Sequence, residues 1–420
     1  MIAFRIFSLV ITCFWAVSTY ADDISLQTAL TQAYGSNPEI AAAEASLDAE
    51  RAAVRSQSFL DDPHIGFTHE ANMNFMELQQ GAMDSLTISQ QFKFPAKYFL
   101  LGKAQNAKAS QAEEQARQKR LEVRARVVTG YYNLFAVERV LMLLSAQRET
   151  LREIARTAEA RYATGAVPQQ DEMKAHVEQT QLEKDILMVE EEKTTAQAMF
   201  IAALGQDSPA TVSLGSHEVA VPKVTTDLSE LSKMVEHHSR HIKEAQASVE
   251  ETDALKSLAY LSYAPDFNLS YRRGIGTYYS QNAYAASVEI TFPLWFFAKQ
   301  SGEVGAASAR AREAERKLEA VKLDHVGELR SLAAKVETNR KMLEIYQTGL
   351  IPQAESTLNS SRASYRAGRS SFIELLDSER SLYTVRIAYY RTLAQYAEQV
   401  AKLEAVTGES VSTLPFGDQL

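Results

Sequence analysis

The sequence predicts a mainly helical protein with a small β part, built from two copies of one structural plan. Residues 86–94 alternate between apolar and polar side chains, which is the pattern of a β-strand with one oily and one wet face. A helical period then continues for about 65 residues, far beyond the length of an ordinary globular helix. The same succession returns about 200 residues later, where residues 284–292 alternate before a second long helical pattern. We therefore expect an internal duplication.

The composition excludes several classes of protein. The chain of 420 residues has a formal net charge of −9, which argues against nucleic-acid binding. Its 17 glycines and 10 prolines are few for that length, as in a chain of long helices. After the first 21 residues no run of 18 apolar residues remains, so strands would have to cross any membrane. We find no nucleophile–base set, zinc-protease motif or phosphate loop, and we expect no enzymatic activity and no cofactor.

Residues 1–21 are typical of a secretory signal peptide. A basic residue precedes the apolar stretch 6–17, small residues follow it, and cleavage is expected before Asp22. The single cysteine, Cys13, lies inside this segment, and Thr12 before it is a poor match to a lipoprotein signal. The mature chain is then expected to lack cysteine and to be held together by packing or oligomerisation.

The first copy covers residues 22–205 and begins with an alanine-rich helical pattern that residues 35–38 interrupt. In its long helix, Val128, Tyr132 and Phe135 recur at threes and fours with alanines nearby, as in closely packed helices. The elements expected, in order, are helices over 24–59, strands over 63–70 and 85–94, a long helix over 97–162 and a return helix over 168–204.

An irregular linker, residues 206–227, leads to the second copy, residues 228–408. The tip sequence Tyr162-Ala-Thr-Gly165 recurs 203 positions later as Tyr365-Arg-Ala-Gly368. The elements expected are a helix over 228–261, strands over 265–272 and 284–292, a long helix over 296–366 and a return helix over 370–406, with residues 409–420 as a C-terminal tail.

Four strands with one apolar and one polar face suit a barrel with lipid outside and water inside. Four strands cannot close, however, and an open sheet edge in hydrocarbon leaves backbone groups unsatisfied at several kcal/mol each. Oligomerisation is therefore expected. Two chains would give a filled barrel, and three would give twelve strands around a lumen, with the long helices forming a hollow cylinder continuous with the barrel.

The whole mature chain resembles the TolC family of outer-membrane efflux channels. The resemblance implies a homotrimer in the outer membrane, in which each chain gives four strands to a shared 12-strand transmembrane barrel and long helices to a periplasmic tunnel. The residues that carry it are Arg161-Tyr-Ala-Thr-Gly165, Ser364-Tyr-Arg-Ala-Gly368, Leu375-Leu376-Asp377 and Tyr132-x-x-Leu-x-Ala136, together with the duplication. Phe94-Pro95-Ala96-Lys97 and the chain length are similar to the heavy-metal-efflux branch of the family.

The resemblance also implies a function and partners. The chain would be the exit duct of a tripartite efflux system, with a periplasmic adaptor protein at the helical tips and an inner-membrane pump, commonly of the resistance-nodulation-division class. The cargo would be heavy-metal cations or drugs. Two alternatives stay open: a channel for type I protein secretion, and a periplasmic coiled-coil scaffold without a pore, against which the four amphipathic strands argue.

A periplasmic gate is expected at the helical tips. Glu374 and Asp377 stand six and nine residues after Gly368, one turn apart on one helix face, where family members carry a ring of acids. Asp171 follows Gly165 at the same distance as Glu374 follows Gly368. The alternative is that these are solvated acids on exposed helices.

Other tip residues are expected to close the entrance or to contact the adaptor. Tyr365 is expected to hold the tip shut by hydrogen bonding across to the neighbouring helix. Drug-efflux members of the family often carry a basic residue two positions after the glycine, where this chain has Ser370. The candidate adaptor contacts are Tyr162, Gly165, Val167, Gly368 and Arg369.

Two residue groups resemble metal ligands, but no metal site is predicted. His237, His238 and His241 include a pair four residues apart on one expected helix, and we interpret them as a solvated polar face. Three methionines of the first hairpin loop can bind soft metal ions, and we interpret them as loop residues. They are Met73, Met76 and Met83.

Overall fold

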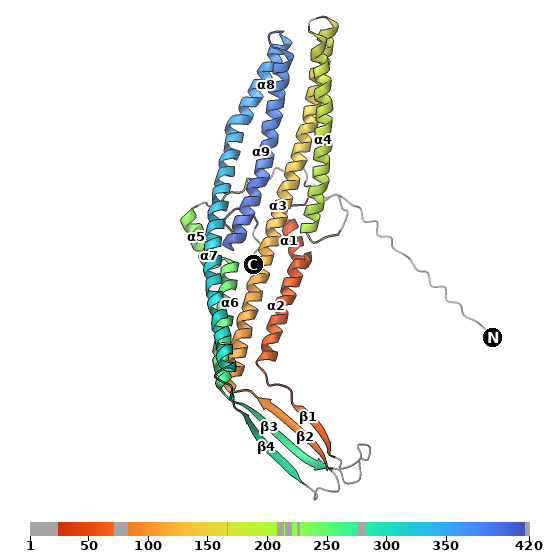
Figure 1. Cartoon of the computed structure of the whole chain (residues 1–420). Helices are drawn as coiled ribbons and strands as arrows, with labels where there is room; N and C mark the ends of the chain where they lie inside the picture. The colour runs from red at the N-terminus through yellow and green to blue at the C-terminus, as the bar shows by residue number, and fades with distance from the viewer. Residues whose placement is uncertain are drawn as a thin grey trace, which may run out of the picture.

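The protein is an elongated, mostly helical chain with a small antiparallel sheet at one end, as predicted (Figure 1). The computed structural model describes residues 24–70, 83–165, 167–207, 214, 221–224, 227–275 and 283–415. The first half contains α1 (Leu26–Ser36), α2 (Pro38–Gln57), β1 (His64–Glu70), β2 (Met83–Phe92), α3 (Pro95–Ala163) and α4 (Gln169–Ala203). The second half contains α5 (Leu228–His238), α6 (Arg240–Tyr260), the 3₁₀ turn η1 (Leu261–Tyr263), β3 (Asp266–Ile275), β4 (Tyr284–Thr291), α7 (Lys299–Ile345), the π-helical turn η2 (Tyr346–Leu350), α8 (Ile351–Arg366) and α9 (Phe372–Thr407).

The sheet has the order β1-β2-β3-β4, and every neighbouring pair is antiparallel. Residues opposite one another share a face, and the register places Ile88 opposite both Ile65 and Tyr271. These three apolar side chains are 44%, 72% and 45% exposed. On the other face the hydroxyls of Ser270 and Ser287 lie 2.6 Å apart. One face of the sheet is thus apolar and uncovered within this chain.

β2 ends at Phe92, two residues earlier than the predicted strand. The next two backbone amides leave the strand ladder, because other acceptors bind them. The Lys93 amide donates to the Tyr98 hydroxyl (3.0 Å), and the Phe94 amide donates to the Asp266 carboxylate (2.9 Å). Pro95, whose fixed φ favours the first helical turn, then starts α3.

Two of the predicted helices are interrupted. The helix expected over 228–261 is broken at Ser239, which lies in an extended conformation between α5 and α6. The long helix expected over 296–366 begins at Lys299 and contains the π turn η2. Pro352 follows this turn and has no amide hydrogen for the carbonyl four residues earlier, so the wider π turn accommodates it.

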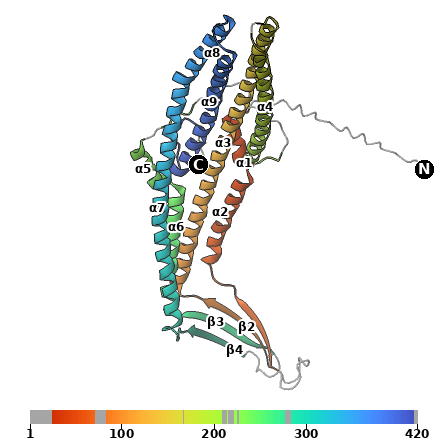
Figure 2. The same ribbon diagram turned by 45° about the horizontal axis from the view of Figure 1, so that its top comes forward.

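The long helices run from the sheet to two paired tips, α3 with α4 and α8 with α9, and both views show the tips at the end opposite the sheet (Figures 1 and 2). The largest core cluster lies between these ends and takes residues from α1 to α7 and from α9. By length and composition, α3 alone among the described helices passes as a membrane span, with 56% of its apolar window buried in the protein. The middle of α3 is therefore core helix.

The duplication appears in the contacts at this core as well as in the sequence. Gly205, just after α4, touches the break between α1 and α2, where an added Cβ would lie 2.6 Å from the Asn37 Cα. Gly408, just after α9, touches the break between α5 and α6, where an added Cβ would lie 2.3 Å from the His238 carbonyl oxygen. Both glycines have positive φ, 75° and 77°. The same close approach of backbones thus occurs once in each copy.

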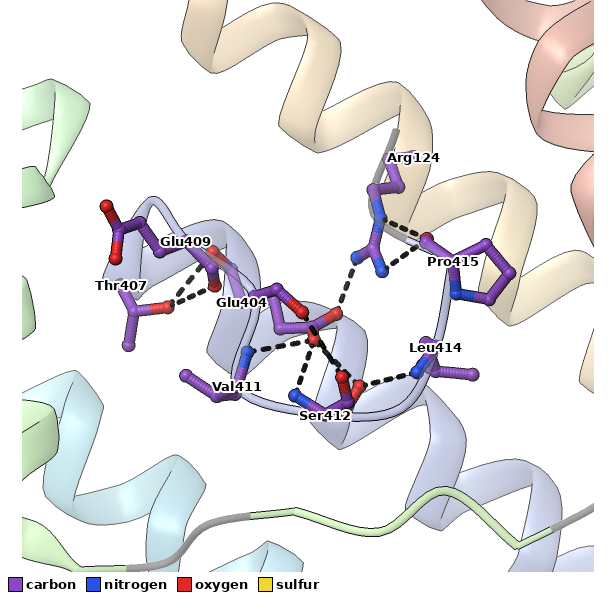
Figure 3. A network of polar contacts seen from close by, with 9 residues as sticks. Arg124, Glu404, Thr407, Glu409, Val411, Ser412, Leu414 and Pro415 are labelled. Carbon is purple, nitrogen blue, oxygen red and sulfur yellow. Dashed lines mark hydrogen bonds and ion pairs between the residues drawn. The ribbon is translucent and has the colours of Figure 1, made fainter. Parts of the chain in front are cut away.

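A buried ion pair fastens the C-terminal segment to the core (Figure 3). Arg124 of α3 donates to Glu404 of α9 at 2.6 Å, and the two side chains are 1% and 0% exposed. The Arg124 guanidinium also donates twice to the Pro415 carbonyl (3.1 and 2.8 Å). The other Glu404 oxygen accepts from the amides of Val411 and Ser412 and from the Ser412 hydroxyl, at 3.1, 3.1 and 2.7 Å. We call these five residues the Arg124–Glu404 clamp.

We predict that Gly408→Ala destabilises the protein much more than Gly368→Ala. Both glycines have a φ above 70°, so each alanine carries the cost of a left-handed conformation, about 1–2 kcal/mol. Only at Gly408 does the new methyl group also collide with backbone, whereas at Gly368 the nearest atom is 3.5 Å away. Urea unfolding followed by circular dichroism measures both variants. Equal midpoints would contradict the prediction.

We predict that Arg124→Met lowers the free energy of unfolding by about 3–5 kcal/mol, because it leaves the buried Glu404 carboxylate without its cation. The matched control is Arg316→Met, which removes an arginine from an exposed pair with Glu319 and should leave the midpoint nearly unchanged. The same urea experiment compares them, and an Arg124→Met midpoint equal to that of the control would count against the clamp.

Candidate functional site

The two helical tips are turns of the same design. α3 ends at Ala163 and α8 at Arg366, and each is followed by a glycine with positive φ, Gly165 at 70° and Gly368 at 72°. The amide of Gly165 donates to the Tyr162 carbonyl at 2.8 Å, and that of Gly368 donates to the Tyr365 carbonyl at 3.0 Å. Glycine is the residue that takes this left-handed position without strain, so the repeated sequence motif produces a repeated turn.

Arg161 joins the two tips to each other. Its guanidinium donates to the Tyr365 carbonyl at 2.6 Å, and its central carbon lies 4.8 Å from the centroid of the Tyr365 ring. The ring is buried and lies 5.9 Å from that of Phe372. Tyr365 thus hydrogen-bonds across to α3, but through its backbone carbonyl. Its hydroxyl is buried without a hydrogen-bond partner in the described part of the chain, and burial raises its pKa.

Glu374 has a local role that the sequence interpretation missed. Ser371 precedes α9, its hydroxyl accepts from the Glu374 amide, and the Glu374 carboxylate accepts from the Ser371 amide, both at 3.3 Å. This reciprocal capping box was readable in the spacing of the two residues, with a serine three positions before a glutamate. Asp377, one turn further along, is exposed, and Asp171 lies half-buried in the first turn of α4. The structure therefore uses one of the predicted gate acids as a helix cap.

The predicted adaptor contacts are accessible at the tips. The Tyr162 side chain is 40% exposed, and Arg369 and both tip glycines are also exposed. Val167 is half-buried beside the start of α4.

Between the tips and the largest core cluster, polar side chains join the two helical hairpins. We call this set the seam, and it consists of residues 147, 150, 178, 192, 379, 380, 383 and 391. Gln147 donates to the Glu379 carboxylate at 3.2 Å, and the hydroxyls of Thr150 and Tyr383 lie 3.3 Å apart. Two ion pairs join α9 to α4 in addition, Arg380 with Glu178 and, at 3.2 Å, Arg391 with Glu192. The seam lies beside two apolar clusters in which residues of α9 also pack against α3 and α4.

Glu379 is the most unusual group in the seam. Its side chain is 3% exposed, and one carboxylate oxygen has no hydrogen-bond partner among the described residues. Burial, opposed by the Gln147 hydrogen bond, raises its pKa to about 7, and the neighbouring Glu178 carboxylate adds to the rise. The cations Arg362 and Arg380 lower this pKa without reversing the rise. Glu379 therefore changes charge within the physiological range, which its position in the sequence did not reveal.

The histidines do not form the pair that the sequence placed on one helix. His237 is the last residue but one of α5, whereas His241 lies in α6 beyond the break at Ser239, so the four-residue spacing does not give a shared face. His241 instead stacks on His325 of α7 with ring centroids 5.1 Å apart. A hydrogen bond to Glu244 raises the pKa of His241. The described residues contain no group of three or more His, Cys, Asp or Glu arranged to hold a metal ion.

Several other residues considered in the sequence lie outside the described part. Cys13, Met73 and Met76 are among them, and Met83 is the first residue of β2.

Comparison with known proteins gives a family match. The model of the family described as outer membrane efflux protein matches residues 29–206 and 231–409, one range in each half of the chain. The cobalt-zinc-cadmium resistance protein CzcC of Cupriavidus metallidurans is 22% identical over 395 residues, which cover 92% of this chain and 91% of CzcC. The outer membrane protein TolC of Vibrio cholerae is 20% identical over 391 residues, covering 90% and 89% of the two chains.

Solved structures share the fold. The Campylobacter jejuni CmeC outer membrane channel matches with a TM-score of 0.79 at 16% identity, over 92% of this chain and 86% of that chain. At this level of identity the match concerns the fold alone.

We predict that the seam loosens as the pH rises, because of Glu379. Its folded-state pKa lies above the ordinary value of 4.5, so the stabilising protonated form is complete below pH 4.5 and is lost as the pH rises through about 7. The loss amounts to about 3 kcal/mol. Glu379→Gln should therefore raise the urea midpoint at pH 8 and leave it unchanged at pH 4.5. Glu315→Gln, an exposed acid on α7, is the control, and equal behaviour of the two variants at both pH values would refute the prediction.

Proposed function

This chain belongs to the outer membrane efflux protein family, and from that premise we infer that it is the exit duct of a tripartite efflux system. The observation that carries the proposal is the family match over both halves of the chain, combined with the different character of the two ends of the molecule. A sheet with an uncovered apolar face stands at one end, and two accessible helical tips stand at the other. A duct from the periplasm through the outer membrane needs both ends.

In this proposal three copies assemble into one channel. Each copy contributes β1–β4 to a 12-strand barrel, with the apolar face of the sheet toward lipid and the polar face toward water. The edge strands β1 and β4, which each pair with a single neighbour here, would pair between copies. The long helices would continue the barrel as a periplasmic tunnel.

The partners we propose are a periplasmic adaptor at the tips and an inner-membrane pump of the resistance-nodulation-division class. The exposed Tyr162 and Arg369, with the turn glycines Gly165 and Gly368 and the neighbouring Val167, form the surface that the adaptor would contact. The Arg161–Tyr365 contact and the seam would hold the tip closed until the adaptor binds.

We propose divalent heavy-metal cations as the cargo. Support comes from CzcC, which is described as a cobalt-zinc-cadmium resistance protein and aligns over nearly the whole of both chains. Exposed acids at the entrance, Asp377 and Glu374, would favour cations over anions there.

Deletion of the gene from its host tests the cargo. We expect the minimum inhibitory concentrations of cobalt, zinc and cadmium salts to fall several-fold, while those of dyes and antibiotics stay at wild-type values. Restoring the gene on a plasmid controls for effects on neighbouring genes. Sensitivity to drugs alone would assign the duct to drug efflux, and loss of a secreted protein without either sensitivity would assign it to protein secretion.

We predict that Asp377→Asn together with Glu374→Gln lowers the cation selectivity of the channel in planar bilayers and weakens its block by multivalent cations from the periplasmic side. In a trimer these positions would bring six carboxylates to the narrowest point. Because Glu374 also caps α9, Asp377→Asn alone separates loss of charge from loss of the cap. Wild-type selectivity and block in both variants would exclude these acids from the gate.

A further inference from the structure

The contact between the two halves of the chain at the junction of sheet and helices is made by one lysine. Lys97, in the first turn of α3, donates to the Asp266 carboxylate at 2.8 Å and to the Ala264 carbonyl at 3.2 Å. The same carboxylate accepts from the Phe94 amide. The Lys97 side chain is only 11% exposed. The base of the first hairpin is thereby tied to the start of β3.

The duplication supplies a second lysine at the equivalent place. His64 pairs with Ser89 in the first hairpin, and Asp266 pairs with Thr291 in the second, so both strands of the hairpin repeat at an offset of 202 residues. The same offset carries Lys97 onto Lys299, the first residue of α7. It carries Ala264 and Asp266 back onto Asp62 and His64, at the start of β1.

Within one chain the second lysine cannot make the equivalent contact. Lys299 follows β4 and Asp62 precedes β1, and these strands are the opposite edges of the sheet. Lys299 and Asp62 are both exposed, and neither side chain has an ion-pair or hydrogen-bond partner among the described residues. Their equivalents in the inner junction, Lys97 and Ala264, are partly covered.

The apolar side chains around the two positions are uncovered in the same way. Phe59, shortly before Asp62, is 73% exposed, and Trp295 and Phe297, shortly before Lys299, are 69% and 65% exposed. Each edge of the chain therefore presents large apolar groups beside a charged side chain without a partner among the described residues, Asp62 at one edge and Lys299 at the other. Glu303 lines the same cavity as Lys299. Two such edges are complementary to each other.

We propose that Lys299 of one copy binds Asp62 of the next copy, repeating between chains the contact that Lys97 makes within the chain. The proposal rests on the trimeric assembly proposed above and names the residues that fasten it at the level where the sheet meets the helices. The ammonium would reach the start of β1 in the neighbouring copy, where Asp62 stands at the place of Ala264, whose carbonyl accepts from Lys97 in the inner junction. Asp62 would add a carboxylate there, two residues before the place of Asp266, which His64 takes. The surrounding Phe59 and Trp295 would exclude water and strengthen the pair.

A phospholipid headgroup is the rival occupant of Lys299. The lysine also lines a cavity of about 370 Å³ between the base of β3 and the start of α7, where a phosphate group would find a cation. A phosphate would have no attraction for Asp62 at the other edge, whereas a second copy satisfies both edges at once. We therefore argue for the second copy and leave the lipid as an outcome of the test.

Thiol crosslinking tests the proposal directly. The chain has a single cysteine, Cys13, inside the expected signal peptide, so introduced cysteines act without competition in the mature chain. A lysine–aspartate pair holds the two Cβ atoms farther apart than a disulfide allows, so a short bismaleimide is the crosslinker. The double variant Asp62→Cys, Lys299→Cys should form covalent dimers and trimers on a denaturing gel, and neither single variant should. The matched control is Lys97→Cys, Asp266→Cys, whose crosslink forms within one chain and leaves the protein at monomer size.

A charge exchange gives an independent measurement. Lys299→Glu and Asp62→Lys alone should each lower the temperature at which the complex dissociates in detergent, and the combination should restore it. Lys322→Glu, an exposed lysine on α7, controls for a general effect of charge.

Native mass measurement of the wild type separates this proposal from the proposed function. A trimer that neither crosslinks at these positions nor shows rescue would overturn the proposed Lys299–Asp62 contact and leave the proposed channel unaffected. Loss of bound phospholipid in Lys299→Glu, with unchanged dissociation temperature, would assign Lys299 to lipid instead. A wild type that forms no trimer would overturn the proposed function itself.

Discussion

The backbone groups at the two edges of the four-stranded sheet impose the main constraint on this molecule. β1 and β4 each have one partner strand, and a whole row of amides and carbonyls on each remains unpaired within the chain. Water can satisfy such groups and hydrocarbon cannot, yet the apolar face that carries Ile65, Ile88 and Tyr271 is unsuited to water. The barrel of several copies that we propose would satisfy both the edges and the apolar face. The same requirement applies to the helices, because α2 precedes the edge strand β1 and α7 follows the edge strand β4.

The clamp and the paired glycines hold the other parts of the chain in place for that assembly. Gly205 and Gly408 let a helix end approach a helix break closely, and the Arg124–Glu404 clamp adds the C-terminal segment to the same level. The ion pair is buried but fully hydrogen-bonded, so its desolvation is compensated. Toward the tips the character of the contacts changes. A small buried apolar cluster joins the two hairpins there, with Ile154 and Ala158 of α3 packed among residues of α8 and α9. Beside it, the seam adds single hydrogen bonds, exposed ion pairs and one partly unsatisfied carboxylate, which are individually weak.

The sequence was sufficient to predict the fold but only part of the site, and the difference has a physical cause. Alternation in strands and the repeat of Tyr162–Gly165 at Tyr365–Gly368 are local patterns, so the four strands and the two tip turns were predictable. Arg161 lies inside a recognised motif, but its partner is a backbone carbonyl 204 positions away. The pattern of side chains in a sequence does not predict a hydrogen bond to a distant carbonyl. The raised pKa of Glu379 likewise depends on which helices bury it. The capping role of Glu374 was the exception, since its spacing from Ser371 was visible and was interpreted only as charge.

The π turn η2 determines which side chains of α8 face the neighbouring helices. A residue added to a helical turn rotates the following helix by about 100° about its axis, since an α-helix has 3.6 residues per turn. α7 packs against α6 and α9 before this turn, and α8 packs against α9 after it, so α9 meets the chain on both sides of the π turn. A shift of one residue, about 100°, changes which sequence positions face α9. An apolar pattern followed with a single helical period along residues 299–366 therefore loses its register at this turn.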